Sequence, residues 1–267
     1  MYPELFRIPY FDFPISTFGV MLATAFLVGL WIATKGLEEY DVDIEPLSTV
    51  FIYVMVGGIG GSKLYFAVDN WIRFGDPFLS YLLARGGITW YGGLIGGAGL
   101  GAIGAWIHGI DVRILLNCAA PACAVGQALG RVGCFLVGDD YGRPTDLPWG
   151  VAFPEGAPPT TVPVHPTQLY EVMWLLPVAG FLWWRRKKSP FLFGEYIALN
   201  GLGRIFIEEL RVNPEVALGL TEPQWIGVAL IVAGVAGWLY YRANPPDSAP
   251  RRGSPAAAGG AKQRSRK

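Results

Sequence analysis

Residues 14–34 read PISTFGVMLATAFLVGLWIAT, a run of 21 residues that contains no charged side chain. A helix needs about 20 predominantly apolar residues to cross a hydrocarbon core about 30 Å thick, so this run predicts a membrane-spanning helix. Six runs of similar length follow, although the fourth and sixth spans carry polar residues inside. The seven expected spans lie near residues 14–34, 49–68, 88–107, 114–137, 168–184, 192–210 and 225–241. An apolar soluble core would not give this many full-length runs, so the sequence predicts an all-α integral membrane protein with seven transmembrane helices.

The composition fits a membrane protein and excludes several other classes. Hydrophobic residues make up 52% of the 267-residue chain and charged residues 16%, against roughly 25% charged residues in an ordinary soluble domain. Lys and Arg number 21, as do Asp and Glu, so the net charge is zero and no nucleic-acid partner is expected. The three Cys and two His are dispersed and no nucleotide-binding motif is present, so neither a metal site nor another cofactor is expected.

Lysine and arginine residues set the expected orientation, because they are enriched in cytoplasmic loops. One basic cluster, at residues 185–188, follows the fifth span, and a second lies near the C terminus. Two spans separate the clusters, which places both on one side, with the C terminus in the cytoplasm and the N terminus outside. Residues 1–242 are expected to form one transmembrane domain. Residues 243–267 are rich in Pro, Ala, Gly and Ser with scattered positive charges, which predicts a disordered basic cytoplasmic tail.

Ionisable residues inside the apolar runs are the main functional signal, because each is costly in a membrane unless it is paired or faces a polar cavity. Arg204 and Glu208 lie four residues apart, and Arg211 lies three residues further on. On one helix these side chains would share a face. We expect that face to line a cavity, with a structural ion pair between helices as the alternative interpretation.

A further cation, Arg131, lies between Gly130 and Gly133, where small neighbours let a head group approach the backbone. A guanidinium can bind a phosphate through two hydrogen bonds, so Arg131 and Arg204 are candidate phosphate ligands, with structural ion pairs again as the alternative. Lys63 also lies beside glycines. It is either another phosphate contact or a side chain that extends to the membrane surface.

Two more side chains are candidates near the ends of spans. Pro166 suits the first turn of a helix with His165 at the cap, and this histidine is either a structural residue or a base that titrates near neutral pH. Tyr91 is followed by Gly92 and a second glycine. Such a tyrosine is either an interfacial anchor or part of a site.

Cationic groups among apolar helices favour a ligand with an anionic head and an apolar body, such as a phospholipid. Two classes of protein have such a site: an integral-membrane enzyme that acts on a phospholipid head group, and a transporter or channel for a lipid or an anion. A transporter commonly has repeated halves. No internal repeat is evident in this sequence, which favours the enzyme.

Four motifs resemble those of the bacterial prolipoprotein diacylglyceryl transferase family and occur in the family's order. Residues 130–142, GRVGCFLVGDDYG, are similar to the signature Gly-Arg-x-Gly-Asn-Phe-x-Asn-x-Glu-x-x-Gly. Residues 165–171, HPTQLYE, resemble His-Pro-Ser-Gln-Leu-Tyr-Glu. Residues 203–211 resemble the stretch Phe-Arg-x-x-x-Glu-x-x-Arg, and residues 91–96 resemble His-Gly-Gly-Leu-Ile-Gly. The resemblance extends from about residue 18 to about residue 214.

This resemblance implies an enzyme of the bacterial inner membrane. Such enzymes move the diacylglyceryl group of phosphatidylglycerol onto the lipobox cysteine thiol in the signal peptide of a prolipoprotein, without a metal or nucleotide. Glycerol phosphate leaves as a thioether forms. The resemblance also implies that Arg131 and Arg204 hold the phosphate and that Glu208 and Arg211 orient them. The candidate catalytic residues are Arg131, Arg204, Tyr91 and Asp139; the candidate substrate-binding residues are Lys63, Gly92, Gly130, Gly133, Cys134, Gly142, His165, Glu208 and Arg211.

Several positions depart from the family pattern. Tyr91 replaces a histidine, Cys134 replaces the first asparagine of the signature, and Asp139 replaces its glutamate. A tyrosine is a poor base near neutral pH, so we expect Tyr91 to donate a hydrogen bond while Asp139 or His165 takes the thiol proton. A thiol also cannot make the hydrogen bonds of an amide. A related membrane transferase for another lipid or acceptor, and a lipid or anion transporter, are the alternative functions.

Overall fold

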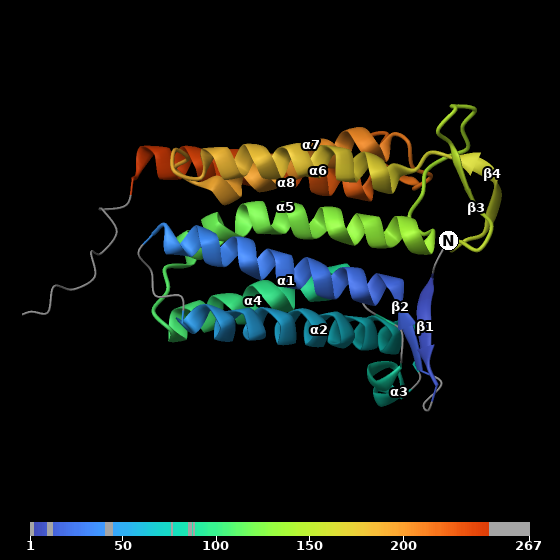
Figure 1. Ribbon diagram of the computed structural model, residues 1–267, viewed down its shortest axis with the longest axis horizontal. Coiled ribbons are helices and arrows are strands. Elements are labelled where there is room, and N and C mark those ends of the chain that lie inside the picture. The colour runs from blue at the N-terminus through green and yellow to red at the C-terminus, as the bar shows by residue number, and fades with distance from the viewer. Residues whose placement is uncertain are drawn as a thin grey trace, which may run out of the picture.

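The computed structural model describes residues 3–9, 13–40, 45–75, 77–84, 87 and 89–245, and these residues form a mainly helical molecule (Figure 1). The helices are α1 (Thr17–Glu38), α2 (Glu45–Phe74), α3 (Phe78–Leu83), α4 (Trp90–Ile107), α5 (Val112–Val137), α6 (Thr167–Arg185), α7 (Leu192–Glu208) and α8 (Glu222–Ala243). Three antiparallel hairpins accompany them: β1 (Glu4–Ile8) with β2 (Phe13–Ser16), β3 (Val151–Phe153) with β4 (Thr160–Val164), and β5 (Glu215–Ala217) with β6 (Leu220–Thr221). Each expected span overlaps one long helix, which confirms the mainly helical prediction.

The helices support a multi-pass membrane protein. Four of them, α1, α2, α5 and α8, are each long and apolar enough to cross a membrane. Helix α4 is apolar but shorter, and α6 and α7 carry charged residues. The count of seven crossings and the orientation of the termini therefore stay predictions. Of the expected tail, residues 246–267 lie outside the described residues.

The mainly helical fold agrees with the prediction of an α-helical membrane protein, and the short hairpins are elements that the sequence does not predict. In β3–β4, Val151 lies opposite Val164, and in β5–β6, Glu215 lies opposite Thr221. The strands have two to five residues. Such short segments give little alternating hydrophobic pattern, and β3 to β6 lie in the connections between apolar runs.

The helices are arranged in three layers (Figure 1). Helices α6, α7 and α8 form one outer layer, α1 and α5 the middle layer, and α2 and α4 the other outer layer. Helix α2 packs closely on α4, because a Cβ atom on Gly57 would overlap the backbone of Gly96 and one on Gly61 would overlap Gly92. Small residues allow such approach between membrane helices. By contrast, α2 and α4 contact α1 and α5 only sparsely.

The main core lies between α5, α6 and α7, where Ala120, Ala124, Leu182 and Leu192 are almost completely buried. Large apolar side chains also lie on the outside of the bundle, and Trp106 is 80% exposed. Exposed apolar surface of this kind suits contact with lipid hydrocarbon.

The end of α5 positions the polar residues that follow it. Gly138 ends the helix in the left-handed conformation, at φ 77°, and its N–H donates to the Cys134 carbonyl at 2.8 Å. Glycine adopts this conformation without a Cβ penalty, which makes it a common helix terminator. The chain then reverses, so Asp139 and Asp140 lie beside the last turn of α5.

Helix α6 begins next to this turn. The Thr167 hydroxyl donates to the Asp140 carbonyl at 2.8 Å, which ties the start of α6 to the end of α5. Pro166 occupies the cap position, and its side chain makes no capping hydrogen bond. The expectation that His165 would be the cap is therefore wrong by one residue.

Candidate active site

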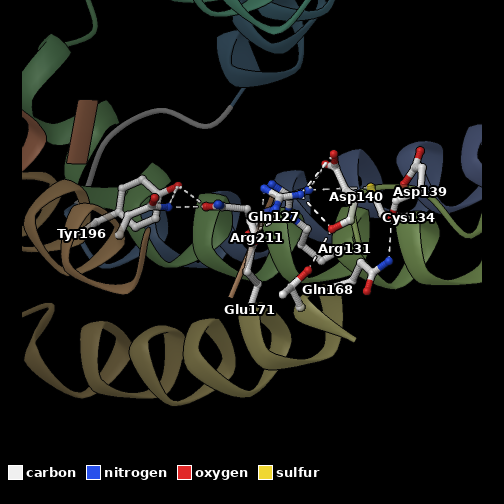
Figure 2. Close-up of polar contacts among 11 residues, drawn as sticks. Gln127, Arg131, Cys134, Asp139, Asp140, Gln168, Glu171, Tyr196 and Arg211 are labelled. Atoms are coloured by element: carbon white, nitrogen blue, oxygen red, sulfur yellow. Dashed lines mark hydrogen bonds and ion pairs between the residues drawn. The ribbon is translucent and has the colours of Figure 1, made fainter. Parts of the chain in front are cut away.

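Arg131, near the end of α5, is held by two carboxylates (Figure 2). Its Nε donates to Glu171 Oε2 at 2.6 Å, and its Nη1 donates to Asp140 Oδ2 at 2.7 Å. The side chains of Arg131 and Glu171 are each 14% exposed, whereas that of Asp140 is 52% exposed. Hydrogen bonds between ionised groups at these distances are the strong ones in proteins. The buried cation expected from the sequence is therefore present, together with its counter-charges.

Arg211 joins the same two carboxylates. Its Nη2 donates to the Asp140 carbonyl at 2.8 Å and lies 3.1 Å from Asp140 Oδ1. Its Nη1 lies 4.0 Å from Glu171 Oε1. We call these four residues, Arg131, Asp140, Glu171 and Arg211, the charged cluster. They bring together the loop after α5, the first turns of α6 and the segment after α7.

The position of Arg211 corrects the spacing argument. Helix α7 ends at Glu208, and the next N–H groups, those of Leu210 and Arg211, bond back three residues to Ile207 and Glu208 at 3.0 and 2.9 Å. Such tightening is common in the last turn of a helix. Arg211 therefore extends from the segment after the helix, and the common helical face expected for Arg204, Glu208 and Arg211 is wrong for its last member.

The two aspartates after α5 have opposite electrostatic environments. Burial opposes the ionisation of Asp140, but the charges of Arg211 and Arg131 outweigh it and lower the pKa of this carboxyl below its usual value. Burial raises the pKa of Asp139, although a hydrogen bond with the Cys134 thiol acts in the other direction. Among the described residues, Asp139 Oδ1 has no hydrogen-bond partner. Asp139 is thus the stronger base of the pair.

Cys134 lies between these groups, with its Sγ 3.8 Å from Arg131 Nη1. The possible ligand atoms of Cys134, Asp139 and Asp140 lie within 4.8 Å of one another, which is the spacing of a metal-ligand set. The Arg131 guanidinium already neutralises Asp140, however, and an added cation would be repelled by it.

Arg204 of α7 reaches the cluster through a small cavity. Arg204, Glu171, Gln127 and Asn200 line this cavity, together with Trp174 and other apolar residues. Its volume is about 10 Å³, close to the space of one water molecule. Glu171 therefore contacts Arg131 directly and shares a cavity wall with Arg204. A phosphate group is larger than this space.

A polar network continues from the cavity along α5 and α7 (Figure 2). The Tyr196 hydroxyl donates to Gln127 Oε1 at 3.1 Å, and the Asn200 amide also donates to this oxygen. Polar groups buried in a membrane bundle are costly unless they are paired. This network explains why the fourth and sixth expected spans contain polar residues.

Glu208 has neighbours other than the expected ones. It is 4% exposed and accepts hydrogen bonds from Asn213 at 2.5 Å and from the Thr221 hydroxyl at 3.2 Å. Both partners lie in the connection between α7 and α8. These contacts make Glu208 an anchor of that connection, and its expected role in orienting Arg131 and Arg204 stays a prediction.

Three candidates lie on α2 and α4, away from the charged cluster. The Tyr91 hydroxyl donates to the Glu222 carboxylate at the start of α8, and Tyr91 also interacts with the charge of Arg204. Lys63 donates to the Ala84 carbonyl. Gly92 lies in the contact between α2 and α4. Tyr91 therefore links α4 to the site, whereas Lys63 and Gly92 have structural neighbours.

The remaining candidates also differ in what surrounds them. A Cβ on Gly130 would meet no atom within 4 Å, whereas one on Gly133 would lie 3.1 Å from Met21 in α1. Gly142 donates its N–H to the His165 carbonyl at 2.9 Å. His165 is 8% exposed, and its Nδ1 lies 3.2 Å from the Tyr170 hydroxyl. Gly130 thus has open space beside its backbone, Gly133 packs α5 on α1, and Gly142 and His165 help to pack the loops.

Sequence reasoning missed Glu171, Asp140, Gln127 and Glu222 as candidate site residues. A usable signal existed for the first two, because an arginine inside a span needs a counter-charge. Asp140 and Glu171 are acidic residues within the stretches 130–142 and 165–171 that resemble family motifs. Gln127 and Glu222 gave no comparable signal, since only the folded chain places them beside Arg204 and Tyr91.

Comparison with known proteins identifies the family. Residues 3–240 match the sequence profile described as prolipoprotein diacylglyceryl transferase. A phosphatidylglycerol–prolipoprotein diacylglyceryl transferase of Nostoc sp. is 34% identical over 253 residues, which cover 88% of this chain and 89% of the relative. The protein of the same name from Clostridium tetani is 33% identical over 245 residues, which cover 88% and 96%. The chain belongs to the prolipoprotein diacylglyceryl transferase family.

Proposed function

We propose that this protein transfers the diacylglyceryl group of phosphatidylglycerol to the lipobox cysteine of a prolipoprotein, the first step of lipoprotein maturation. Family membership and the printed names of the relatives support this activity. In the reaction, the bond between a glyceryl carbon and a phosphate oxygen breaks, and a carbon–sulfur bond forms. Glycerol phosphate leaves with the bonding electrons, and the thiol gives up its proton.

The charged cluster is the observation that carries the assignment of the site. Before substrate binds, Asp140 and Glu171 hold the guanidinium groups of Arg131 and Arg211 in place. The incoming phosphate replaces Asp140, the more exposed of the two carboxylates, and takes over its hydrogen bonds. Arg204 approaches from the cavity that it shares with Glu171. The arginines then offset the charge that develops on the leaving phosphate.

The thiol proton passes to Asp139 in this proposal. Its raised pKa makes it a better proton acceptor than an ordinary aspartate, and its Oδ1 makes no hydrogen bond to another described residue. Tyr91 acts as a hydrogen-bond donor across the gap between α4 and α8, where it now bonds Glu222. His165 is engaged with Tyr170, which makes it the weaker candidate for the base.

The orientation in the membrane follows from the basic residues at one end of the bundle. We propose seven crossings of the bacterial inner membrane, with the N terminus outside and the C terminus in the cytoplasm. Basic residues mark the ends of α1, α6 and α8 and the start of α5: Lys35, Arg113, Arg185, Arg186, Lys187 and Arg242. The charged cluster lies at the other end of α5, which this orientation places toward the outer leaflet.

The test is complementation of a bacterial strain depleted of its own transferase, scored by the mass of a lipoprotein substrate. Arg131→Ala and Arg204→Ala should each abolish the added mass of the diacylglyceryl group while protein abundance is unchanged. Arg73→Ala is the matched control, because Arg73 is exposed and pairs with Asp69, four residues away on the same helix, at 3.0 Å, so it should behave like the wild type. Normal modification by both Arg131 and Arg204 variants would refute the phosphate role.

A further inference from the structure

A second cationic cavity lies at the opposite end of the bundle from the charged cluster, where α1, α6 and α8 end and α5 and α7 begin. We call it the distal cavity. Its volume is about 430 Å³, and its walls include Arg113, Arg186, Lys187, Glu39 and Tyr241. Small-molecule sites in proteins commonly have volumes of roughly 300–1,000 Å³. Arg113 and Arg131 lie 18 residues apart on α5, which at 1.5 Å per residue is roughly 27 Å. The two sites are therefore separate.

Positive charge exceeds negative charge among the described walls of this cavity. Glu39 supplies a carboxylate, and both of its oxygens accept from Arg186, with distances from Nη2 and Nε between 2.8 and 3.1 Å. Lys187 Nζ lies 3.5 Å from the same carboxylate. The hydrogen bond from Arg186 lowers the pKa of Glu39, against the effect of burial. Glu39 therefore stays ionised, but it serves two cations already.

Arg113 is the third cation in the wall of the distal cavity, and one of its N–H donors lacks an acceptor among the described residues. Its Nε is buried and has no hydrogen-bond partner among the described residues. Its guanidinium lies over the Tyr241 ring, 5.4 Å from the ring centre, and both side chains line the cavity. A buried donor without an acceptor costs free energy, and the fork of N–H donors of a guanidinium matches the geometry of a phosphate.

We propose that the distal cavity binds a phosphate group, with Arg113 as its main contact and Arg186 and Lys187 as secondary contacts. The phosphate comes either from the head group of an anionic lipid in the adjoining leaflet or from a soluble phosphate ester. Basic cavities between membrane helices are a known type of site for anionic lipid head groups. The proposal does not depend on the transferase activity, because it uses none of the residues of the charged cluster.

The experiment uses the full chain in nanodiscs of phosphatidylcholine, carrying Arg131→Gln so that phosphate binding at the charged cluster is weakened. Inorganic phosphate is titrated calorimetrically at constant ionic strength. In this background, Arg113→Gln should weaken binding at least tenfold. Arg242→Gln is the matched control, because Arg242 lies at the same end over the Trp238 ring, 5.1 Å from its centre, and does not line the cavity. It should change the affinity less than twofold.

A second probe separates the two sources of phosphate. The same proteins are placed in nanodiscs that contain phosphatidylglycerol, and retained lipid is counted by native mass spectrometry. Loss of one retained lipid on Arg113→Gln, without binding of inorganic phosphate, assigns the site to a lipid head group. Binding of inorganic phosphate that depends on Arg113 assigns it to soluble phosphate. If neither probe distinguishes Arg113→Gln from Arg242→Gln, the proposal is overturned.

Two further measurements cover the case in which Arg113→Gln does not fold and test whether this variant retains diacylglyceryl transfer. If Arg113→Gln does not fold, Lys187→Gln replaces it, because the Lys187 side chain is 67% exposed. Lys187→Gln should weaken phosphate binding about threefold. An unchanged affinity would overturn the proposal. With Arg131 restored, Arg113→Gln should keep diacylglyceryl transfer. Failure of phosphate binding in the distal cavity and failure of the transferase assignment are therefore distinguishable.

Discussion

The exchange of Arg131 for lysine separates a catalytic role from a structural one. Arg131 makes two charge-assisted hydrogen bonds at different nitrogens, one to Glu171 at 2.6 Å and one to Asp140 at 2.7 Å. A lysine keeps the charge but loses the planar fork that spans both carboxylates. One such bond contributes about 1.5–3 kcal/mol to stability. For a protein of this size that corresponds to a fall in Tm of roughly 3–12 °C.

The effect on turnover should exceed the effect on stability. Loss of one donor to a developing anion typically lowers kcat by about 10²–10³, so Arg131→Lys should lower transfer by that factor at a temperature where the protein stays folded. The assay measures the transfer of diacylglyceryl from phosphatidylglycerol vesicles to a lipobox peptide by mass, with Tm measured on the same sample. A variant with a lowered Tm and an unchanged kcat would refute the catalytic role and leave Arg131 as a structural ion pair.

Three further predictions concern the other candidates. Tyr91→Phe should reduce turnover in vesicle assays, because the hydroxyl that bonds Glu222 is lost, while Tyr91→His should be tolerated; unchanged kinetics for Tyr91→Phe would make this residue structural. Asp139→Asn should slow transfer, and it should raise Tm at pH 7.5 but not at pH 3. The pKa of Asp139 is raised in the folded protein. The contribution of Asp139 to stability is therefore present at low pH and is lost as pH rises through that pKa. An equal shift in Tm at both pH values would contradict this. Gly92→Ala should lower protein abundance rather than substrate affinity, because the added Cβ overlaps Gly61; normal abundance with a raised KM would show that Gly92 contacts substrate.

The helices could be predicted from the sequence because the membrane fixes their length. The run at residues 14–34 corresponds to α1, although the helix begins later, at Thr17, where Ser16 accepts a hydrogen bond from the Gly19 N–H. The β3–β4 hairpin could not be predicted in the same way. It lies in a polar, proline-rich connection, and its strands, of three and five residues, are too short to give an alternating pattern, although Phe153 and Val164 are buried.

The candidate site could be predicted in its cations but not in its geometry. Arg131 stood out because a charge inside an apolar run needs an explanation. Its partners Asp140 and Glu171 follow only from the turn at Gly138 and from the packing of α6 on α5. Arg211 was placed on the wrong element, because helical spacing holds only as far as the helix continues, and α7 stops at Glu208.

In the proposed function, Arg131 and Arg204 converge on one lipid phosphate. An experimental structure of the protein with phosphatidylglycerol bound tests this arrangement. It should place the phosphate oxygens within hydrogen-bond distance of both guanidinium groups, with Asp140 turned away from Arg131. A bound lipid whose phosphate lies elsewhere, while Arg131 still contacts Asp140 and Glu171, would contradict it.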